Sequence, residues 1–401
     1  MAINDADDRM DRTQLVVIGS GAAGLMAALA AAPRAEVVLV TDRAVGRSNT
    51  AMAQGGLQLP LTTPTSLAAF VDDMLESARV PVNEARVRSF AGSVPQTVAQ
   101  LVSWGLQLQR DEQGEPVRRI AGGMRAPRVV NTTTLIGPAI IKLLRRRLAC
   151  SSVTVLGNCS VERIQPVSQG LRVELAGQAA IEASRVVCCS GGRSYQEALR
   201  RGHPTSNPVN QNHTLYDELV SLGLPRVEPD AYQYHPFGLV RSLKSGVGTC
   251  VPESINGFSV RLLDRHGIEL GPIRQDRYAL TRRMLEANEA GRALQAPDGH
   301  PGFRLTLSEL PRSTLIDVFP KLHGRLKAWG SVGEDVLVFP FLHYQLGGFE
   351  VDPDGRSGVP GLWLAGEMVG GIHGRNRLMG NGLTDSLVHG RRAGLAACQH
   401  P

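Results

Sequence analysis

The sequence predicts an α/β protein in which a parallel sheet, flanked by helices, is interrupted along the chain by an inserted second domain. Three observations predict this fold class. A glycine-rich turn joins a strand to a small-residue helix near the start, short alternating segments follow between residues 151 and 192, and strand patterns return late in the chain. We therefore expect residues 1–230 and 345–401 to form one domain, and residues 231–344 to form the inserted α+β domain.

The first unit reads strand, turn, helix and strand in the segment QLVVIGSGAAGLMAALAAAPRAEVVLVTD. It contains the pattern G-x-G-x-x-G at Gly19, Gly21 and Gly24. In such a unit the first glycine permits the tight turn, the second lets backbone amides approach a pyrophosphate, and the third lets the helix lie close to the strand. The unit therefore predicts a Rossmann-like dinucleotide site, with Thr41 and Asp42 as alternative contacts to the ribose.

Four short alternating segments, VTVL, SVERI, LRVEL and SRVVCC, predict a small antiparallel sheet that interrupts the parallel one. The last of them ends in Ser190-Gly191-Gly192, a second glycine turn suited to the close approach of a ligand. The inserted domain has one clear helical pattern, from about Arg277 to Ala290. GGFEVDP and PGLWLAGE then predict strands, and a helix follows the polar, glycine-rich stretch that begins near the end of the chain.

The composition excludes several classes of protein. The net charge of +6 is not gathered into a basic stripe and aromatic residues make up 4% of the chain, so nucleic acid is not an expected partner. The six cysteines have no C-x-x-C spacing, which predicts reduced thiols and no metal site. No apolar run approaches the ~20 residues of a membrane span. Because the acidic first residues also lack the layout of a signal peptide, cytoplasmic residence is the expectation.

Six motifs, in the family's order, resemble the fumarate reductase, succinate dehydrogenase and L-aspartate oxidase flavoprotein family. They are VVIGSGAAGL, SNTAMAQGGL, CSGG, YQYHPFGL, HYQLGGFEVDPDGRSGVPGLWLAGEMVGG and HGRNRLMGNGLTDSLVHGRRAG, and they span nearly the whole chain. The resemblance is closest to L-aspartate oxidase-like members, although the chain is short for the group, which predicts that the family's C-terminal helical domain is missing. It implies FAD rather than NAD, and a mobile capping domain formed by residues 231–344.

The resemblance also implies which residues hold the FAD. In covalent members a histidine at the second position of the SNTA motif is tethered to the flavin; here that position is Asn49, so noncovalent FAD is expected. Glu367 would contact the ribityl or ribose region, and the last helix would aim its positive end at the flavin. The implied cofactor-binding residues are Gly19, Gly21, Ala22, Ala23, Gly24, Thr41, Asp42, Ser48, Asn49, Thr50, Ala53, Gln54, Gly55, Gly56, Ser190, Gly191, Gly192, Glu367, Asn381, Gly382 and Leu383.

A further implication of the resemblance is a set of residues that bind a substrate anion. These are His235 in QYHP, His343 in HYQLGG and Arg377 in GRNR. Arginine suits this task because its planar fork holds a carboxylate in two charge-assisted bonds, and histidine supplies an adjustable donor. His373 and Arg375 receive no role.

The family's proton-delivering arginine corresponds to Arg277, with Arg274 as the alternative. An arginine acid needs a relay partner, because the pKa of its guanidinium exceeds about 12. Glu253 or Asp276 is the expected relay, although Asp276 is equally suited to cap the helix that follows it.

Three departures from the family's pattern concern the substrate. Residues 252–256 read PESIN where the family has Thr-Glu-Ala and an arginine two residues on. Residues 121–125 read AGGMR where L-aspartate oxidases have a glutamate and a Gly-Gly-His-Ser motif. The lost acid and the nearby cation argue against an α-ammonium group in the same place. The family's GDG turn is also replaced, near residues 210–213.

Together these features predict an FAD-dependent oxidoreductase acting on a small carboxylic or amino acid, in an L-aspartate oxidase-like oxidation or dehydrogenation next to a carboxylate. The alternatives are a fumarate reductase-like C=C reductase or desaturase, and a flavin-binding electron-transfer or scaffold protein without substrate chemistry of its own. Oxygen, a quinone or another compound is the expected electron acceptor.

Overall fold

The computed structural model describes residues 12–208 and 213–399. Two sequence expectations concern residues outside these ranges. They are the acidic first residues, on which the expectation of cytoplasmic residence partly rests, and the replaced glycine turn near residue 210. Within the described ranges, no helix combines the length and the apolar character needed to cross a bilayer.

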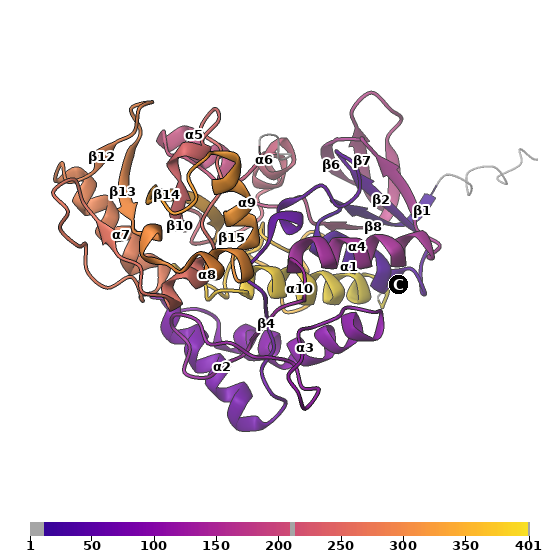
Figure 1. Ribbon diagram of the computed structural model, residues 1–401. Coiled ribbons are helices and arrows are strands. Elements are labelled where there is room, and N and C mark those ends of the chain that lie inside the picture. Colours follow the sequence, from indigo (N-terminus) through magenta and orange to yellow (C-terminus); the bar gives the residue numbers. More distant parts are fainter. Residues whose placement is uncertain (1–11, 209–212, 400–401) are drawn as a thin grey trace, which may run out of the picture.

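A seven-stranded sheet with the order β5-β2-β1-β8-β7-β6 forms the centre of the larger part of the molecule, and β16 pairs with β8 (Figure 1). Strands β1, β2, β5, β8 and β16 run parallel, whereas β6 and β7 form an antiparallel hairpin. The strands are β1 (Arg12–Ile18), β2 (Val37–Thr41), β5 (Thr154–Gly157), β6 (Val161–Val167), β7 (Gly170–Leu175), β8 (Ile181–Cys188) and β16 (Leu362–Leu364).

The expectation of a small antiparallel sheet is confirmed for three of its four segments, as part of the same sheet, and is wrong for VTVL. VTVL supplies β5, the parallel edge strand beside β2, and SRVVCC supplies β8 in the middle of the sheet. SVERI, LRVEL and SRVVCC supply β6, β7 and β8, which pair antiparallel in turn, and β8 also pairs parallel with β1. A short parallel edge strand alternates in polarity just as a hairpin strand does, so the pattern alone did not separate the two.

The helices α1 (Ala22–Ala31) and α10 (Asn381–Ala397) pack in close contact beside this sheet. Every residue of α1 is buried, as its run of small apolar residues predicts. A Cβ added to Gly390 or Gly394 would lie 2.3 Å from a backbone oxygen of α1. The two helix backbones touch because glycine faces alanine along their contact, and the two helices run parallel, with Ala23 beside Gly390 and Ala27 beside Gly394.

Three more helices cover this part of the molecule: α2 (Pro64–Ser77), α3 (Glu84–Ser103) and α4 (Ile136–Ala149). In Figure 1, α2 and α3 form the lower edge of the molecule, below α10. The strand pair β3 (Leu57–Gln58) and β4 (Val129–Val130) connects them to the centre. Their apolar faces belong to one core with α1, α4 and α10.

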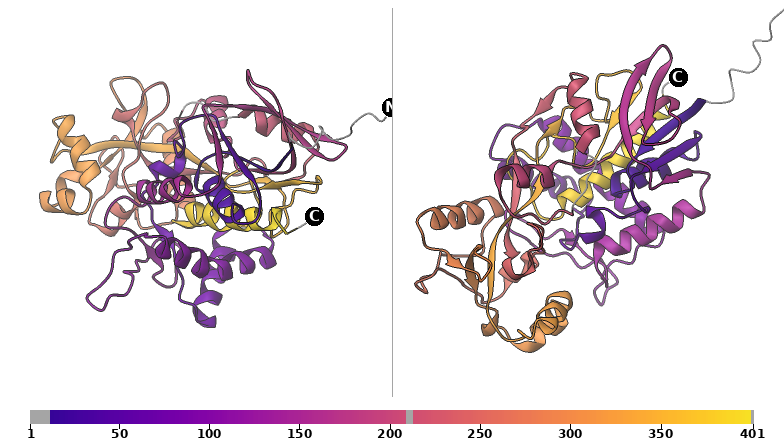
Figure 2. Two further views of the ribbon diagram at one scale, coloured as in Figure 1. Left: turned by 90° about the vertical axis from the view of Figure 1, so that its right-hand side faces the viewer. Right: turned by 90° about the horizontal axis from the view of Figure 1, so that it is seen from above.

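A second unit has its own antiparallel sheet, with the order β10-β14-β13-β11 and β12 paired to β13. Figures 1 and 2 show it to one side of the larger sheet. It has a separate hydrophobic core, formed by residues between 237 and 341. Its elements are β10 (Tyr232–Leu239), η2 (Val240–Ser242), η3 (Glu253–Gly257), β11 (Leu262–Leu263), α7 (Arg277–Glu289), β12 (Leu294–Gln295), β13 (Pro301–Leu305), η4 (Leu307–Glu309), α8 (Arg312–Asp317), α9 (Pro320–Ala328) and β14 (Val336–Gln345).

The strands β10 and β14 form the connection between the two units. They pair antiparallel, so the chain enters the second unit and leaves it side by side. The remaining elements are η1 (Asn49–Met52), α5 (Ser194–Arg201), α6 (His213–Ser221), β9 (Arg226–Val227) and β15 (Gly348–Phe349). The strand predicted from GGFEVDP is only the two residues of β15, which pair with β9. The fold class agrees with the prediction, while the proposed boundaries after residues 230 and 344 stay a prediction.

Candidate active site

The glycine turn after β1 leaves no room for a side chain at two of its three motif positions. A Cβ on Gly19, where φ is +99°, would lie 2.4 Å from a backbone oxygen, and one on Gly24 would lie 1.7 Å from the Gly19 oxygen. Gly21 precedes α1, and its nearest neighbours are side-chain atoms of Ser48 and Thr50 at 3.6 to 3.7 Å. The N-terminus of α1 therefore faces the Ser48–Thr50 segment, and the Ala22 backbone N–H donates to Thr50 Oγ1 at 3.0 Å.

The two candidate ribose contacts lie in different environments. Thr41 ends β2, is buried, and has its hydroxyl oxygen 2.8 Å from that of Ser20. Asp42 follows the strand, and 31% of its side chain is exposed beside Arg43. Burial raises the pKa of Asp42 despite the opposing effect of Arg43. Because the Thr41 hydroxyl is already engaged within the protein, the geometry favours Asp42 as the group available to a ligand.

A second glycine turn, after β8, adjoins Glu367. Gly191 has φ +90° and open space where its Cβ would be, whereas a Cβ on Gly192 would lie 2.8 Å from Cγ of Glu367. The Glu367 Oε1 accepts hydrogen bonds from Ser194 Oγ at 2.9 Å and from the Gln345 backbone N–H at 3.0 Å. Burial raises the pKa of Glu367, and these hydrogen bonds oppose the increase. Glu367 thus connects the start of α5, just after the turn, to the end of β14 through one of its two oxygens.

The SNTAMAQGG segment runs from the start of α1, where Gly21 neighbours Ser48 and Thr50, toward α10, where a Cβ on Gly55 would lie 3.3 Å from Met379. Asn49 Nδ2 donates to Asn207 Oδ1 at 2.6 Å, while Asn49 Oδ1 is buried without a hydrogen-bond partner among the described residues. A Cβ on Gly56, where φ is +86°, would lie 2.6 Å from backbone and side-chain atoms of β4. Gln54 is exposed, unlike the residues that follow it.

The start of α10 holds a side chain whose polar atoms are unsatisfied. Asn381 is 1% exposed, and neither its Oδ1 nor its Nδ2 has a hydrogen-bond partner within residues 12–208 and 213–399. A buried polar group left unpaired costs about 1–3 kcal/mol. These atoms, the orphaned Asn49 oxygen and the glycine turns all suit a polar, phosphate-bearing cofactor lying across the two helix N-termini.

Arg277 begins α7 and is 7% exposed. Its Nε and Nη2 lie 2.7 and 2.6 Å from one oxygen of Glu253, and its Nη1 donates to Gln233 Oε1 at 3.3 Å. Arg274, the alternative, is exposed and donates to backbone oxygens of η3. Asp276 caps α7 by accepting from the backbone N–H of residue 279, and it pairs with an arginine at the end of α2. Of the two candidate relays, only Glu253 contacts Arg277.

The two predicted histidines lie on paired strands with their ring centroids 5.4 Å apart. His235 Nδ1 accepts from the Phe237 backbone N–H at 3.3 Å, and His343 Nδ1 lies 2.7 Å from Ser206 Oγ. Burial, and then the positive charge of Arg277, hold the pKa of both histidines well below the usual value. Both rings are therefore neutral near pH 7, and each can donate one hydrogen bond.

Arg377 approaches the same region from the glycine-rich stretch. It is 6% exposed, its guanidinium lies 4.5 Å over the Tyr344 ring, and its Nη1 donates to the Leu378 carbonyl at 3.3 Å. Its Nε has no partner among the residues the structure describes. Burial and the nearby Arg277 lower the pKa of Arg377 to about 10, so it remains a cation at neutral pH. A buried cation with a free donor is suited to bind an anion.

The structure thus brings Arg277, Glu253, His235, His343 and Arg377 into one buried region. Sequence reasoning missed several neighbours that complete it. Gln233 contacts Arg277 and also donates to the backbone carbonyl of Arg377 at 3.0 Å. It stands two residues before His235, and this strand spacing could have identified it. The other missed neighbours are Ser206, Asn207, Tyr344 and Asn376.

The hypothesis about Arg125 is wrong. Its guanidinium pairs with Asp73 and Glu76 of α2, and 54% of its side chain is exposed. The cation therefore points away from the buried region and gives no argument against an ammonium group there. A residue beside a motif in the sequence need not point toward the same site as the motif. Here the Arg125 side chain is directed by its ion pairs with Asp73 and Glu76.

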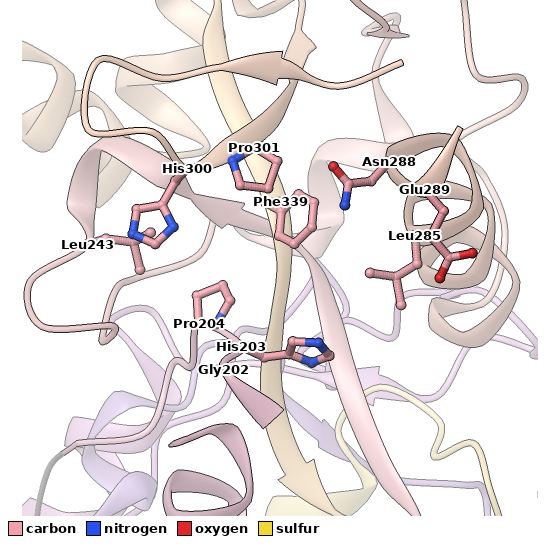
Figure 3. A pocket seen from close by; sticks show the side chains of 10 residues that line it. All are labelled: Gly202, His203, Pro204, Leu243, Leu285, Asn288, Glu289, His300, Pro301 and Phe339. Carbon is pink, nitrogen blue, oxygen red and sulfur yellow. The ribbon is translucent and has the colours of Figure 1, made fainter. Parts of the chain in front are cut away.

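A cavity of about 290 Å³ lies apart from these residues, between the end of α7 and the segment after α5. Figure 3 shows Leu285, Asn288 and Glu289 on one side of Phe339, with His203 below it. The cavity is not lined by any of the predicted site residues.

Comparison with known proteins agrees with the geometry. A family model described as an FAD-binding domain matches residues 14–383. An L-aspartate oxidase from Agrobacterium fabrum is 30% identical over 392 residues, which cover 95% of this chain and 73% of that protein. The fumarate reductase flavoprotein subunit of Mycobacterium tuberculosis is 28% identical over 426 residues, covering 96% of this chain and 70% of that protein.

Solved structures give the same result. The E. coli quinol fumarate reductase superposes with a TM-score of 0.85 and 25% identity, over 97% of this chain and 70% of that one. The fold, the glycine turns and these matches define an FAD-dependent oxidoreductase. The chain belongs to the FAD-binding flavoprotein family that includes fumarate reductase flavoproteins and L-aspartate oxidases. The family predicted from the sequence motifs is confirmed, as is FAD as its cofactor.

Proposed function

We propose that this FAD-dependent oxidoreductase oxidises or dehydrogenates a small carboxylate-bearing substrate at a carbon next to the carboxylate. The observation that carries the proposal is the charge balance of the buried region. Glu253 already forms an ion pair with Arg277, and among the described residues no carboxylate forms an ion pair with Arg377. The similar proteins named L-aspartate oxidase and fumarate reductase support a carboxylate as the missing anion.

The residues that would hold FAD fit the two helix N-termini. The Gly19–Gly24 turn would take the pyrophosphate on backbone amides, and Asp42 would take the ribose. Asn381 and the following residues at the start of α10 would meet the flavin with unpaired donors. Asn49 has an amide already bonded to Asn207, which supports a noncovalent cofactor.

When it is bound, FAD supplies hydride exchange with the substrate carbon. Arg377 binds the substrate carboxylate, because a guanidinium holds a carboxylate in two parallel, charge-assisted bonds. The neutral His235 and His343 donate one hydrogen bond each to the same substrate and fix its orientation. The orphaned Tyr344 hydroxyl, buried beside Arg377, is a further donor in reach of this region.

Arg277 and Glu253 hold the proton that the reaction must move. A guanidinium gives up a proton only in a water-poor site with a base in contact, because its pKa otherwise exceeds about 12. Glu253 makes that contact, and Arg277 is nearly buried. Oxygen, a quinone or another compound is the proposed acceptor of the electrons.

A second candidate function is reduction of a C=C bond beside a carboxylate. The Arg277–Glu253 pair favours it, because a proton donor at this position can complete a reduction in which hydride adds to the neighbouring carbon. The same residues could act in oxidation of a saturated acid and in reduction of a C=C bond, so the substrate determines which of the two reactions occurs.

The test is anaerobic mixing. The oxidised protein is mixed with L-aspartate, other amino acids and succinate, and the photoreduced protein with fumarate, while the flavin absorbance is followed. Bleaching by a saturated acid supports oxidation, and reoxidation by fumarate supports the reductase. If none of these acids changes the flavin, the carboxylate proposal is wrong. A scaffold without chemistry of its own would respond to none of them and would keep its function in Arg377→Ala.

A further inference from the structure

A second group of buried ionisable side chains contacts residues 370–378, the glycine-rich stretch that contains Arg377. Asp385 of α10 is 3% exposed and is contacted by two histidines. His373 Nε2 lies 3.2 Å from one carboxylate oxygen, and His389 Nδ1 makes a very short contact with the other. The His389 ring stacks on Phe90 of α3, with centroids 5.6 Å apart. Both oxygens of Asp385 are thus occupied by neighbours from different segments.

The helix periodicity places this group in line with the cofactor region. Asn381, Asp385 and His389 are spaced by four residues, so they follow one another along a single face of α10. The first member has the orphaned amide at the helix start, and the second contacts the preceding stretch through His373. One helix face therefore connects the region proposed for FAD with the segment proposed to bind substrate.

Arg86 of α3 contacts the backbone at the start of the same stretch. It is 6% exposed, and its Nη1 donates to the Gly370 carbonyl at 3.1 Å. A Cβ on Gly371, where φ is +101°, would lie 2.6 Å from that nitrogen. The backbone at the start of the stretch therefore lies directly on the guanidinium. Burial lowers the pKa of Arg86, and the charge of Asp385 opposes this effect.

The far end of the stretch is fixed by neutral groups. Asn376 Nδ2 donates to Ser77 Oγ at 3.0 Å, and the Arg375 backbone N–H donates to the Ala78 carbonyl at 2.7 Å. The Arg377 carbonyl is held by Gln233, as described above. His373 lies between these two anchored ends, and its side chain reaches α10. The His373–Asp385 contact is therefore a further attachment of the stretch before Arg377.

We propose that Asp385, itself oriented by His389, is a positioning residue that fixes His373 and, through it, the backbone segment carrying Arg377. The proposal rests on the proposed role of Arg377 as the carboxylate anchor. An ionised carboxylate accepts a hydrogen bond from each histidine, one on each oxygen. An amide at this position has one oxygen and one NH₂ group, so the NH₂ group would face one of the two histidines as a second donor. The charges around the group are Arg86, Arg377, Arg392, Glu350 and Asp352.

The experiment uses the full chain loaded with FAD, with Asp385→Asn as the main variant. Malonate is the carboxylate probe, and its dissociation constant is read from the change in flavin absorbance. Hydrogen–deuterium exchange of residues 370–378 reports the position of the segment directly. Asp264→Asn is the matched control, because Asp264 is 1% exposed and forms its ion pair with Arg292 within the second unit.

Asp385→Asn is expected to weaken malonate binding by about tenfold or more, a loss typical of one charge-assisted hydrogen bond. Exchange of residues 370–378 should become faster, while FAD binding stays within about twofold of the unmodified protein. His389→Phe should show a smaller loss of the same kind, and His389→Gln, which keeps a donor, should restore much of it. Asp264→Asn should leave malonate binding unchanged.

Unchanged malonate binding and unchanged exchange in Asp385→Asn would overturn the proposal. Parallel loss of FAD and malonate binding would also overturn it, because that pattern marks general damage rather than positioning. If Asp385→Asn does not fold, the comparison of His389→Phe with His389→Gln decides in the same way. If malonate does not perturb even the unmodified protein, the proposed function fails instead, and the exchange of residues 370–378 alone decides on Asp385.

Discussion

Arg277 and Glu253 meet through two nitrogens and a single oxygen: the Arg277 Nε and Nη2 lie 2.7 and 2.6 Å from Glu253 Oε2. Their side chains are 8% and 13% exposed, so water reaches neither freely. Each begins its own element, α7 and η3 respectively. The pair therefore joins two elements of the second unit at a point facing Gln233, and removal of either partner leaves the other as a nearly buried, uncompensated charge.

Glu253→Gln removes the proposed base while keeping the size of the side chain. We expect turnover to fall by about 10²- to 10⁴-fold, the usual range for a general acid–base group, with FAD content unchanged. Steady-state kinetics with the substrate found by anaerobic mixing gives the measurement. Glu286→Gln is the control, since this residue pairs with Arg282 on the exposed side of α7, the helix that Arg277 begins. Turnover within threefold of the unmodified protein would exclude Glu253 from the proton path.

Arg377→Ala removes the proposed carboxylate anchor. We expect kcat/KM to fall by about 10²- to 10³-fold, because a charge-assisted bond to a buried carboxylate is lost, while FAD remains bound. Arg377→Lys should recover only part of the loss, since a lysine cannot form the paired contact. The control is Arg375→Ala, which removes a neighbouring arginine that is half exposed and pairs with Glu228. Equal kinetics in Arg377→Ala and Arg375→Ala would contradict the role of Arg377.

The sequence predicted a residue's role where the local backbone conformation requires glycine, or where a family motif marks the position. Gly19 and Gly24 were predicted because their turn excludes a side chain, and the structure places other atoms within 2.4 Å of both missing Cβ positions. The positions of Arg277 and Arg377 came from motifs, which give a place in the chain. Only the folded structure shows which groups contact Arg277 and Arg377, and at what distances.

The sequence was not informative where partners are far apart in the chain or where patterns coincide. Glu253 was one of two candidate relays, and only the packing of η3 against α7 distinguished it from Asp276. Arg125 was misread because its direction depends on two acids of α2, about 50 residues away in sequence. The edge strand β5 was misassigned because alternation does not report whether a neighbour runs parallel.

His343 predicts a loss of stability in mild acid. Burial and nearby positive charges hold its pKa well below the value in an unfolded chain. Below pH ~6.5 the unfolded chain therefore binds a proton that the folded protein does not. The free energy of unfolding should fall with decreasing pH in this window, by up to about 1.4 kcal/mol per pH unit for each such histidine, and stay constant above it.

His343→Gln tests this dependence by removing one of these histidines. Urea unfolding of the FAD-loaded protein at pH 5.5, 6.5 and 7.5 should give a shallower slope than in the unmodified protein, by about one proton. His266→Gln, at an exposed position, is the matched control. The same slope in His343→Gln and the unmodified protein would show that His343 does not stay neutral on folding.

Asn49 predicts that FAD is released intact by denaturation. An amide has no nucleophile for a bond to the flavin, and its Nδ2 is engaged with Asn207. Acid precipitation of the FAD-loaded protein should leave all flavin absorbance in the supernatant, with the mass of free FAD. The precipitated chain should have its unmodified mass. Flavin fluorescence that stays with the precipitated chain would contradict the prediction and require another attachment residue.

Arg79 and Asp276 predict a salt-sensitive contact between the larger part of the molecule and the second unit. Arg79 Nη2 lies 2.6 Å from Asp276 Oδ2, and Asp276 also caps the helix that Arg277 begins. Arg79 adopts φ +64°, which is unusual for a residue with a side chain. The pair is partly exposed, so its strength is modest and screened by salt. Because it adjoins Arg277, loosening it should displace Arg277 relative to the substrate anchor Arg377.

Arg79→Ala should raise KM by about two- to fivefold at low salt, in line with the loss of one exposed ion pair. It should also remove most of the dependence of KM on ionic strength, because in the unmodified protein salt weakens the same contact. Arg88→Ala is the control, since Arg88 forms an exposed ion pair with Glu84 within α3 alone. If KM and its salt dependence are the same in Arg79→Ala as in Arg88→Ala, the contact plays no part in placing Arg277.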